Sequence, residues 1–130
     1  MRIALALLGS ILGAMPAMAA MSAAEFAARV TGKTIYYTTM GTPSGVEEYL
    51  PGQRARWMDR DGTCIEGTWF ESAGTICFDY PDYGPVQCWI VDAIGEQLRA
   101  YRPGSSPVSG FISYREDDTP LPCPAADLGV

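Results

Sequence analysis

Carboxylate side chains are the residues of this chain whose types and spacing come nearest to a catalytic pattern. Glu47 and Glu48 are adjacent, Asp59 and Asp61 are separated by one residue, and Glu66 follows. Glycoside hydrolysis needs two carboxyl groups that face each other across a cleft. Adjacent residues of a strand point to opposite faces, so Glu47 and Glu48 cannot both serve one site. We expect solvated charges at strand edges and turns, with a carboxylate-dependent glycosidase as the weaker alternative.

Other catalytic and metal-binding patterns are missing from the sequence. The chain has no histidine and no CxxC pair, which removes His-activated nucleophiles and the usual zinc ligands. It also has no Gly-rich phosphate-binding loop. The run Asp59-Arg60-Asp61-Gly62 resembles the start of a calcium loop, but the later ligands are absent, and a hairpin turn explains it better. We therefore expect no catalytic residue, no metal ion and no cofactor, and a protein that is not an enzyme.

Aromatic side chains are the third group that could serve a site, with three tryptophans and seven tyrosines. We expect Trp69 and Trp89 to lie in the core. The Tyr-Tyr dipeptide at 36–37 must send one ring to each face of a strand. Aromatic rings at the mouth of a barrel can stack on a sugar ring or hold an extended peptide. The candidate ligand contacts are Trp57, Tyr36, Tyr37 and Tyr49.

The N-terminal segment has the features of a cleavable signal peptide. Arg2 supplies a positive charge, residues 3–15 form an uncharged apolar stretch, and Ala17-Met18-Ala19 favours cleavage after Ala19. A retained membrane anchor is the competing interpretation, but the later part of the stretch is Ala-rich and contains Pro16. We therefore predict a signal peptide over residues 1–19, no stable membrane span after cleavage, and a periplasmic or secreted protein.

Export places the four cysteines in an oxidising compartment, where they should pair. Four cysteines allow three pairings. Counting back through a turn at residues 81–85 places Cys77 nearly opposite Cys88, so that a cross-strand bridge is plausible. We favour Cys77–Cys88 together with Cys64–Cys123, because the second bridge would fasten the Pro-rich C-terminal segment to the sheet.

One helix is predicted, over residues 22–31. Ser22 and Glu25 have the spacing of a capping box. Phe26 and Val30 share one helix face, and Gly32 is placed to end the helix in a left-handed conformation. Two helical turns are marginal alone. We expect this helix to dock on one end of the sheet through Phe26 and Val30.

From Lys33 onward, short apolar and aromatic runs alternate with Gly, Pro and Asp, which is typical of strands joined by hairpin turns. The predicted strands are 34–40, 46–50, 54–59, 64–70, 75–80, 86–92, 97–101 and 108–115. The fold class is all-β: an antiparallel β-meander of seven or eight strands over residues 34–115, closed as a barrel or strongly curled, with one short N-terminal helix. Residues 20–130 form one domain, and residues 116–130 form an irregular tail held by Cys123.

Alternation along the strands separates a core face from an outer face. The predicted core face carries Ile65, Gly67, Trp69, Ile76, Phe78, Tyr80, Trp89 and Val91. The cysteines of these strands fall on the opposite face.

The composition bears on the class of partner. Nine basic and 15 acidic side chains give a formal net charge of −6. This balance argues against nucleic acid and anionic lipid as partners.

The cysteine and tryptophan pattern resembles a known family. The residues that carry the resemblance are Gly32-Lys33-Thr34, Glu48-Tyr49, Trp57, Gly62-x-Cys64-x-x-Gly67-x-Trp69, Cys77-Phe78-x-Tyr80, Cys88-Trp89 and Pro122-Cys123-Pro124. This series is similar to a family of small uncharacterised exported proteins of alphaproteobacteria. The resemblance implies an exported, disulfide-linked β-domain and implies no activity.

The sequence thus predicts an exported, non-enzymatic binding or interaction module of the cell envelope. Its partner would be an envelope protein, a peptide or a glycan. The alternative is an inhibitor of an envelope or foreign hydrolase, which should present a rigid protruding loop, at residues 41–45 or 103–107. A binding module should instead show a concave aromatic pocket.

Overall fold

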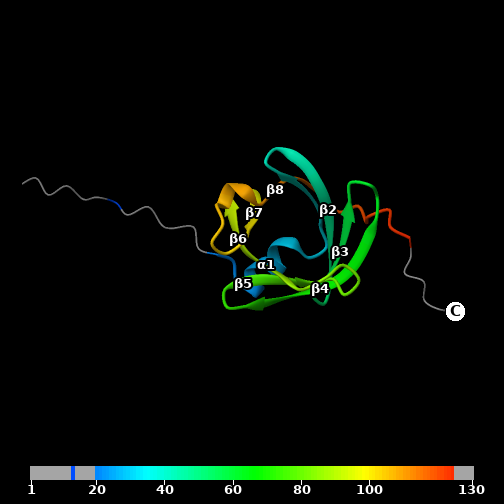
Figure 1. Cartoon of the computed structure of the whole chain (residues 1–130), viewed down its shortest axis with the longest axis horizontal. Helices are drawn as coiled ribbons and strands as arrows, with labels where there is room; N and C mark the ends of the chain where they lie inside the picture. The colour runs from blue at the N-terminus through cyan, green and yellow to red at the C-terminus, as the bar shows by residue number, and fades with distance from the viewer. Residues whose placement is uncertain (1–12, 14–19, 125–130) are drawn as a thin grey trace, which may run out of the picture.

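A computed structural model describes Gly13 and residues 20–124. The predicted signal peptide, apart from Gly13, and the last part of the tail, residues 125–130, lie outside the described residues. The described chain forms a closed antiparallel barrel of eight strands with the helix α1 within the ring of strands (Figure 1). The elements are α1 (Ala23–Val30), β1 (Thr34–Thr39), β2 (Thr42–Leu50), β3 (Arg54–Asp59), β4 (Cys64–Ser72), β5 (Thr75–Asp79), β6 (Gln87–Ile94), β7 (Gln97–Tyr101), the 3-10 helix η1 (Pro107–Ser109) and β8 (Phe111–Asp117).

Each strand pairs with the next along the chain, and β8 pairs with β1 to close the barrel. The predicted fold class is therefore confirmed, in its closed form. Closure satisfies the backbone groups that an open sheet would leave at its two edges. The β7–β8 pairing is short, from Arg99↔Ile112 to Ala100↔Phe111, whereas β1–β8 pairs over six positions from Thr34↔Asp117 to Thr39↔Phe111.

The meander gives the barrel two different ends. The connections after β2, β4 and β6 lie at one end together with α1, and we call this the closed end. The connections after β1, β3, β5 and β7 lie at the other, which we call the open end. The longest connections, residues 80–86 and 102–110, are both at the open end. The two ends therefore differ in what covers them.

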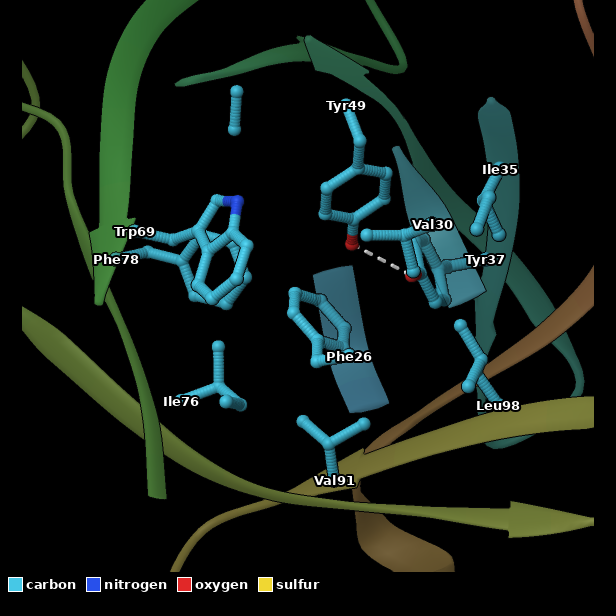
Figure 2. Close-up of a cluster of buried hydrophobic side chains, with 11 residues drawn as sticks. Phe26, Val30, Ile35, Tyr37, Tyr49, Trp69, Ile76, Phe78, Val91 and Leu98 are labelled. Atoms are coloured by element: carbon cyan, nitrogen blue, oxygen red, sulfur yellow. Dashed lines mark hydrogen bonds between the residues drawn. The ribbon is translucent and has the colours of Figure 1, made fainter. Parts of the chain in front are cut away.

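The helix α1 is built to fit the closed end. Ser22 and Glu25 form the predicted capping box. Phe26 and Val30 are buried, and Phe26 lies at the centre of the core in Figure 2. The Gly32 amide, at a φ of +82°, donates to the Tyr49 carbonyl at 2.8 Å. The Arg29 guanidinium binds Glu116 and the Glu96 carbonyl, so that both faces of the helix are held.

The core occupies the closed half of the barrel and follows the predicted faces. Trp69, Ile76, Phe78 and Val91 are buried there together with Ile35 and Leu98 (Figure 2). Ile65, Tyr80 and Trp89 also point inward, but they are only half-buried. Inward residues of the open half therefore face a space that the core does not fill.

Most strand limits lie within two residues of the prediction, but two strands begin three or more residues away from it. β2 begins at Thr42 rather than at residue 46, because Met40 and Gly41 form a tight turn with φ of +48° and +79° and Thr39 pairs with Thr42. This turn matches the right-handed twist of a hairpin. The extra residue Ser44 is accommodated as a bulge, whose hydroxyl donates to the Tyr37 carbonyl at 3.1 Å. Segment 41–45 is therefore mostly strand rather than loop.

The second correction concerns the start of the last strand. β8 begins at Phe111, and the predicted strand residue Val108 lies in η1 with an exposed side chain. Pro107 at the start of η1 has no amide hydrogen to offer a sheet, whereas it suits the first position of a helical turn. The segment before Phe111 is thus part of the open-end loop.

Both favoured disulfides are present. Cys77 pairs in register with Cys88 on β6 and is bridged to it, and Cys64 is bridged to Cys123. The described part of the tail is irregular and lies on the outer surface: Thr34 Oγ1 donates to the Thr119 carbonyl at 2.7 Å, and the buried Leu121 donates its amide to Glu48 at 3.1 Å. Within the described ranges, no helix has the length and hydropathy needed to cross a membrane.

The core assignment predicts a large effect for Trp69→Ala. Trp69 is 3 % exposed, and its ring centroid lies 4.9 Å from that of Phe26 in an edge-on contact. Removing a buried Trp should lower the free energy of unfolding by about 3–5 kcal/mol in urea titrations. Phe70→Ala is the matched control, because Phe70 lies next in β4 and is 41 % exposed. A loss below about 1 kcal/mol for Trp69→Ala would mean that the faces of β4 are inverted.

Candidate functional site

The open half of the barrel contains a cavity of about 360 Å³. It extends from Phe26 of α1 at its floor to Tyr83 and Pro85 in the connection between β5 and β6. Every strand contributes a lining residue, and most of the lining is aromatic or aliphatic. This is the concave aromatic pocket that a binding module should show.

The floor of the cavity is the upper surface of the core. Phe26 meets Tyr49, Trp69 and Phe78 in edge-on contacts, with ring centroids 5.5, 4.9 and 6.3 Å away. Phe78 in turn stacks on Tyr80 at 6.3 Å. Edge-on and offset contacts of this kind are favourable beyond the area they bury. The floor is thus a packed aromatic surface, and Phe26 of α1 lies at its centre.

The wall of the cavity is a second aromatic cluster, formed by Tyr37, Trp57, Trp89 and Phe111. Tyr37 and Trp57 are stacked with centroids 6.4 Å apart. Phe111 lies edge-on to Trp57 at 5.7 Å and to Trp89 at 5.2 Å. These rings come from β1, β3, β6 and β8, which are brought together by closure of the barrel.

A carboxyl group, Glu47 on β2, lies between the floor and the wall. The residue is 6 % exposed. Tyr49 donates its hydroxyl hydrogen to Glu47 Oε2 at 2.7 Å, and the Tyr80 hydroxyl donates to Oε1. The Tyr37 hydroxyl lies 2.8 Å from that of Tyr49, which links the wall to the same network (Figure 2). A single buried carboxyl thus organises three tyrosines.

Burial changes the acidity of this network. Loss of hydration raises the pKa of Glu47 to about 7, against the opposing effect of the hydrogen bonds from Tyr80 and Tyr49. Burial, followed by the charge of Glu47, raises the pKa of Tyr37, Tyr49 and Tyr80 well above the ordinary value for tyrosine. The hydroxyls therefore remain donors, and Glu47 changes its charge near neutral pH.

A second carboxyl group lines the cavity nearer the open end. Asp59, at the end of β3, accepts a hydrogen bond from Trp57 Nε1 at 2.6 Å. Gly45 pairs with Asp59 and Glu47 pairs with Trp57, so the two carboxyl groups lie on the same inner face of adjacent strands. The bond to Asp59 also fixes the orientation of the indole in the wall.

Two glycines make room for the rings beside Glu47. A Cβ at Gly45 would lie 2.1 Å from Cζ2 of Trp57, and a Cβ at Gly67 would lie 2.6 Å from Cδ1 of Tyr80 and 2.1 Å from the Asp79 carbonyl oxygen. Any larger residue would therefore displace these rings or the strand. Gly45 and Gly67 belong to the site although they carry no functional group.

The structure separates the predicted ligand contacts. Trp57, Tyr37 and Tyr49 line the cavity, as a binding role requires. Tyr36 does not, because it alternates with Tyr37 and lies on the outer face of β1. There it stacks under the Arg115 guanidinium at 4.3 Å and contacts Tyr114. The structure therefore places Tyr36 apart from the other three candidates.

The prediction of solvated carboxylates is wrong for Glu47 and Glu48, which are 6 % and 7 % exposed. Glu47 faces the cavity, whereas Glu48 faces outward, under the tail, and binds Arg56 and the Leu121 amide. The prediction of a hairpin turn at residues 59–62 is right, since the Gly62 amide donates to the Asp59 carbonyl at 2.9 Å. Among the described residues, no cluster of acidic or cysteine side chains is arranged to hold a metal ion.

The sequence analysis weighed Glu47 and Asp59 only for the weaker glycosidase alternative, took Tyr80 as a core residue and did not consider Phe111. A signal for Glu47 was present: it lies two residues before Tyr49, a candidate ligand contact, and therefore on the same face of the strand. Comparison of the chain with protein-family models, with curated proteins and with solved structures gave no match. The site is therefore interpreted from its own geometry.

The buried carboxyl predicts a specific pH dependence of stability. The pKa of Glu47 is raised to about 7 in the folded protein, so its contribution is fully present below its unfolded pKa and is lost as pH rises through about 7. Between pH 5 and 8, wild type should lose about 2 kcal/mol more of its free energy of unfolding than Glu47→Gln. Urea titrations at the two pH values measure this difference.

The matched control for that measurement is Glu96→Gln, the same chemical change in the exposed turn after β6. This variant should keep the wild-type pH profile. Parallel pH profiles for wild type and Glu47→Gln would show that Glu47 is hydrated and not part of a buried network.

Proposed function

We propose that this protein is an exported binding protein that takes up a small, largely apolar molecule inside its barrel. The observation that carries the proposal is the 360 Å³ cavity, lined by every strand and extending to the open end. Small-molecule sites are concave, mostly apolar and about 300–1,000 Å³ in volume, with a few placed polar groups. The cavity has this size and composition, and its polar groups include the carboxyl groups of Glu47 and Asp59.

The architecture supports the same function by analogy. Eight-stranded up-and-down barrels are just wide enough to hold one small ligand between their inner side chains. Here α1 occupies the closed end, which leaves the ligand one route, through the open end. Because fold alone does not define function, the lining residues and not the barrel carry the proposal.

The partners expected from the sequence are narrowed by this geometry. A cavity of about 360 Å³ suits a small molecule, such as an aromatic compound or a single sugar ring, better than a folded protein or a long peptide. For the inhibitor alternative, segment 41–45 is mostly strand, with its exposed turn at Met40 and Gly41. The exposed segment 103–106 at the open end is what supports that alternative.

A glycosidase is a second candidate, because Glu47 and Asp59 are two carboxyl groups on one cavity wall and the raised pKa of Glu47 suits a general acid. Binding is favoured over hydrolysis because both oxygens of Glu47 already accept hydrogen bonds from tyrosines. Turnover of aryl glycosides that disappears in Glu47→Gln would favour the enzyme.

We further propose that the protein acts in the periplasm or outside the cell. Two supports are the signal-like pattern of residues 1–19 and the two disulfides, which persist in oxidising compartments. The resemblance to exported alphaproteobacterial proteins points the same way. The binding site would then meet solutes of the cell envelope.

Binding of the neutral fluorophore N-phenyl-1-naphthylamine tests the function. We expect one molecule per barrel, with fluorescence enhancement and a dissociation constant in the micromolar range. Thr39→Trp should weaken binding by about tenfold or more, since Thr39 lines the cavity at the end of β1 and an indole there would fill the open end. Thr68→Trp is the control, because Thr68 is exposed on the outer face of β4. Equal binding to both variants would place the probe outside the barrel.

Export is tested by the intact mass of protein recovered after expression of the full chain in a bacterium. We expect the mass of a chain that begins at Ala20, and we expect no reaction with a thiol reagent under denaturing, non-reducing conditions. Protein that keeps residues 1–19, or that carries free thiols, would contradict export and full pairing.

A further inference from the structure

The charged groups that line the cavity are all of one sign. Glu47 and Asp59 contribute carboxyl groups, and no Lys or Arg is found among the described residues that form the lining. A basic group, the exposed Arg102, contacts one lining ring, with its guanidinium 4.5 Å from the Trp89 ring centroid. A ligand with a carboxylate or phosphate would meet repulsion and would find no ion-pair partner inside the barrel.

Glu47 is charged at alkaline pH without a compensating cation. Its partners are the hydroxyls of Tyr49 and Tyr80, and within the described chain no basic side chain forms an ion pair with it. An ionised carboxyl has about four acceptor positions, so two donors leave room for further hydrogen bonds. Burying a charge without a counter-charge is costly, and an incoming cation would remove that cost.

The aromatic wall supplies the other half of a cation site. Tyr37, Trp57, Trp89 and Phe111 surround the space next to Glu47 and Asp59. Ring faces attract cations, and indole does so most strongly. The Arg102–Trp89 contact shows that one ring of this wall accepts a cation on its face in this molecule.

We propose that the ligand is a small organic cation, an amine with an aromatic or aliphatic body, whose ammonium group binds Glu47 and Asp59 while its body lies among the rings of the wall. This inference rests on the proposed function and names the chemical class that the same cavity takes. The ammonium replaces the missing counter-charge, and the body displaces water from an apolar surface. A neutral ligand gains only the displacement of water from the apolar surface, and an anion is repelled by the carboxyl groups.

Several elements place other titratable groups around the cavity that contains Glu47. β1 contributes Tyr37, β2 contributes Tyr49, β3 contributes Asp59, and the segment after β5 contributes Tyr80 and Tyr83. α1 presents Phe26 to the cavity, and its Arg29 is bound to Glu116 on the outer rim of the closed end. The tyrosines keep their protons because burial raises their pKa, so near pH 7 Glu47 is the group of this network expected to change its charge.

Three indole compounds of similar shape test the charge preference by calorimetry with the mature, oxidised protein: tryptamine (cation), tryptophol (neutral) and indole-3-propionate (anion). We expect tryptamine to bind at least about tenfold more tightly than tryptophol at pH 8, and indole-3-propionate to bind least. Because the pKa of Glu47 is about 7, tryptamine affinity should rise about tenfold from pH 6 to pH 8, while tryptophol affinity stays level.

Glu47→Gln tests whether the preference for tryptamine over tryptophol arises in the cavity. The ratio of tryptamine to tryptophol affinity should fall about tenfold, and its pH dependence should disappear. Asp59→Asn should lower the same ratio, which keeps the test available if Glu47→Gln does not fold, as judged by circular dichroism. Glu96→Gln removes one surface charge at the closed end and should keep the wild-type ratio.

The outcomes distinguish the cation preference from the proposed binding of a small molecule. Binding of N-phenyl-1-naphthylamine with no preference among the three indoles, with a preference for the anion, or with no indole bound at all would overturn the cation proposal and keep the binding function. Failure of the neutral fluorophore and of every indole to bind would overturn both. A tryptamine preference that survives both carboxyl substitutions would place the cation outside the cavity and overturn the assignment.

Discussion

The packing of Phe26 into the closed end of the barrel is the interaction on which the rest of the structure depends. Eight strands enclose more space than the inner side chains of this sequence fill. Phe26 and Val30 complete the core of the closed half, and Phe26 contacts Tyr49, Trp69 and Phe78 edge-on. Because those rings are held from below, the cavity above them has a defined floor. The helix thus divides one interior into a core and a site.

The site itself is a compromise between burial and charge. Glu47 lies where hydrophobic packing would favour an apolar residue, and the tyrosine hydroxyls offset only part of the cost of its burial. The two glycines beside it add a further cost in strand propensity, because each leaves a strand position without a side chain. Such local departures from the most stable choice are common at functional sites. These departures gather in the half of the barrel that holds the cavity.

Much of the fold could be predicted because its signals are local. The capping box at Ser22, the alternation of Trp69, Ile76 and Phe78, and the opposition of Cys77 to Cys88 each depend on a few neighbouring residues and one hairpin register. The predicted start of β2 was wrong because residue types that usually form a turn lie within the strand. Pro43 and Gly45 are typical of a turn, but a bulge at Ser44 accommodates them in β2. Glycine is needed at position 45 because the ring of Trp57, on the next strand, occupies the space that a Cβ would need.

The sequence by itself determined the all-β meander, the short helix and the inward or outward face of most residues, since period-2 alternation and capping operate over a few residues. Only the tertiary structure decided that β8 meets β1, because closure depends on the accumulated twist and tilt of all eight strands. Closure in turn brings Glu47, Asp59, Tyr80 and Phe111 around one space. Glu47 becomes a buried carboxyl group with tyrosine partners only when the barrel surrounds it.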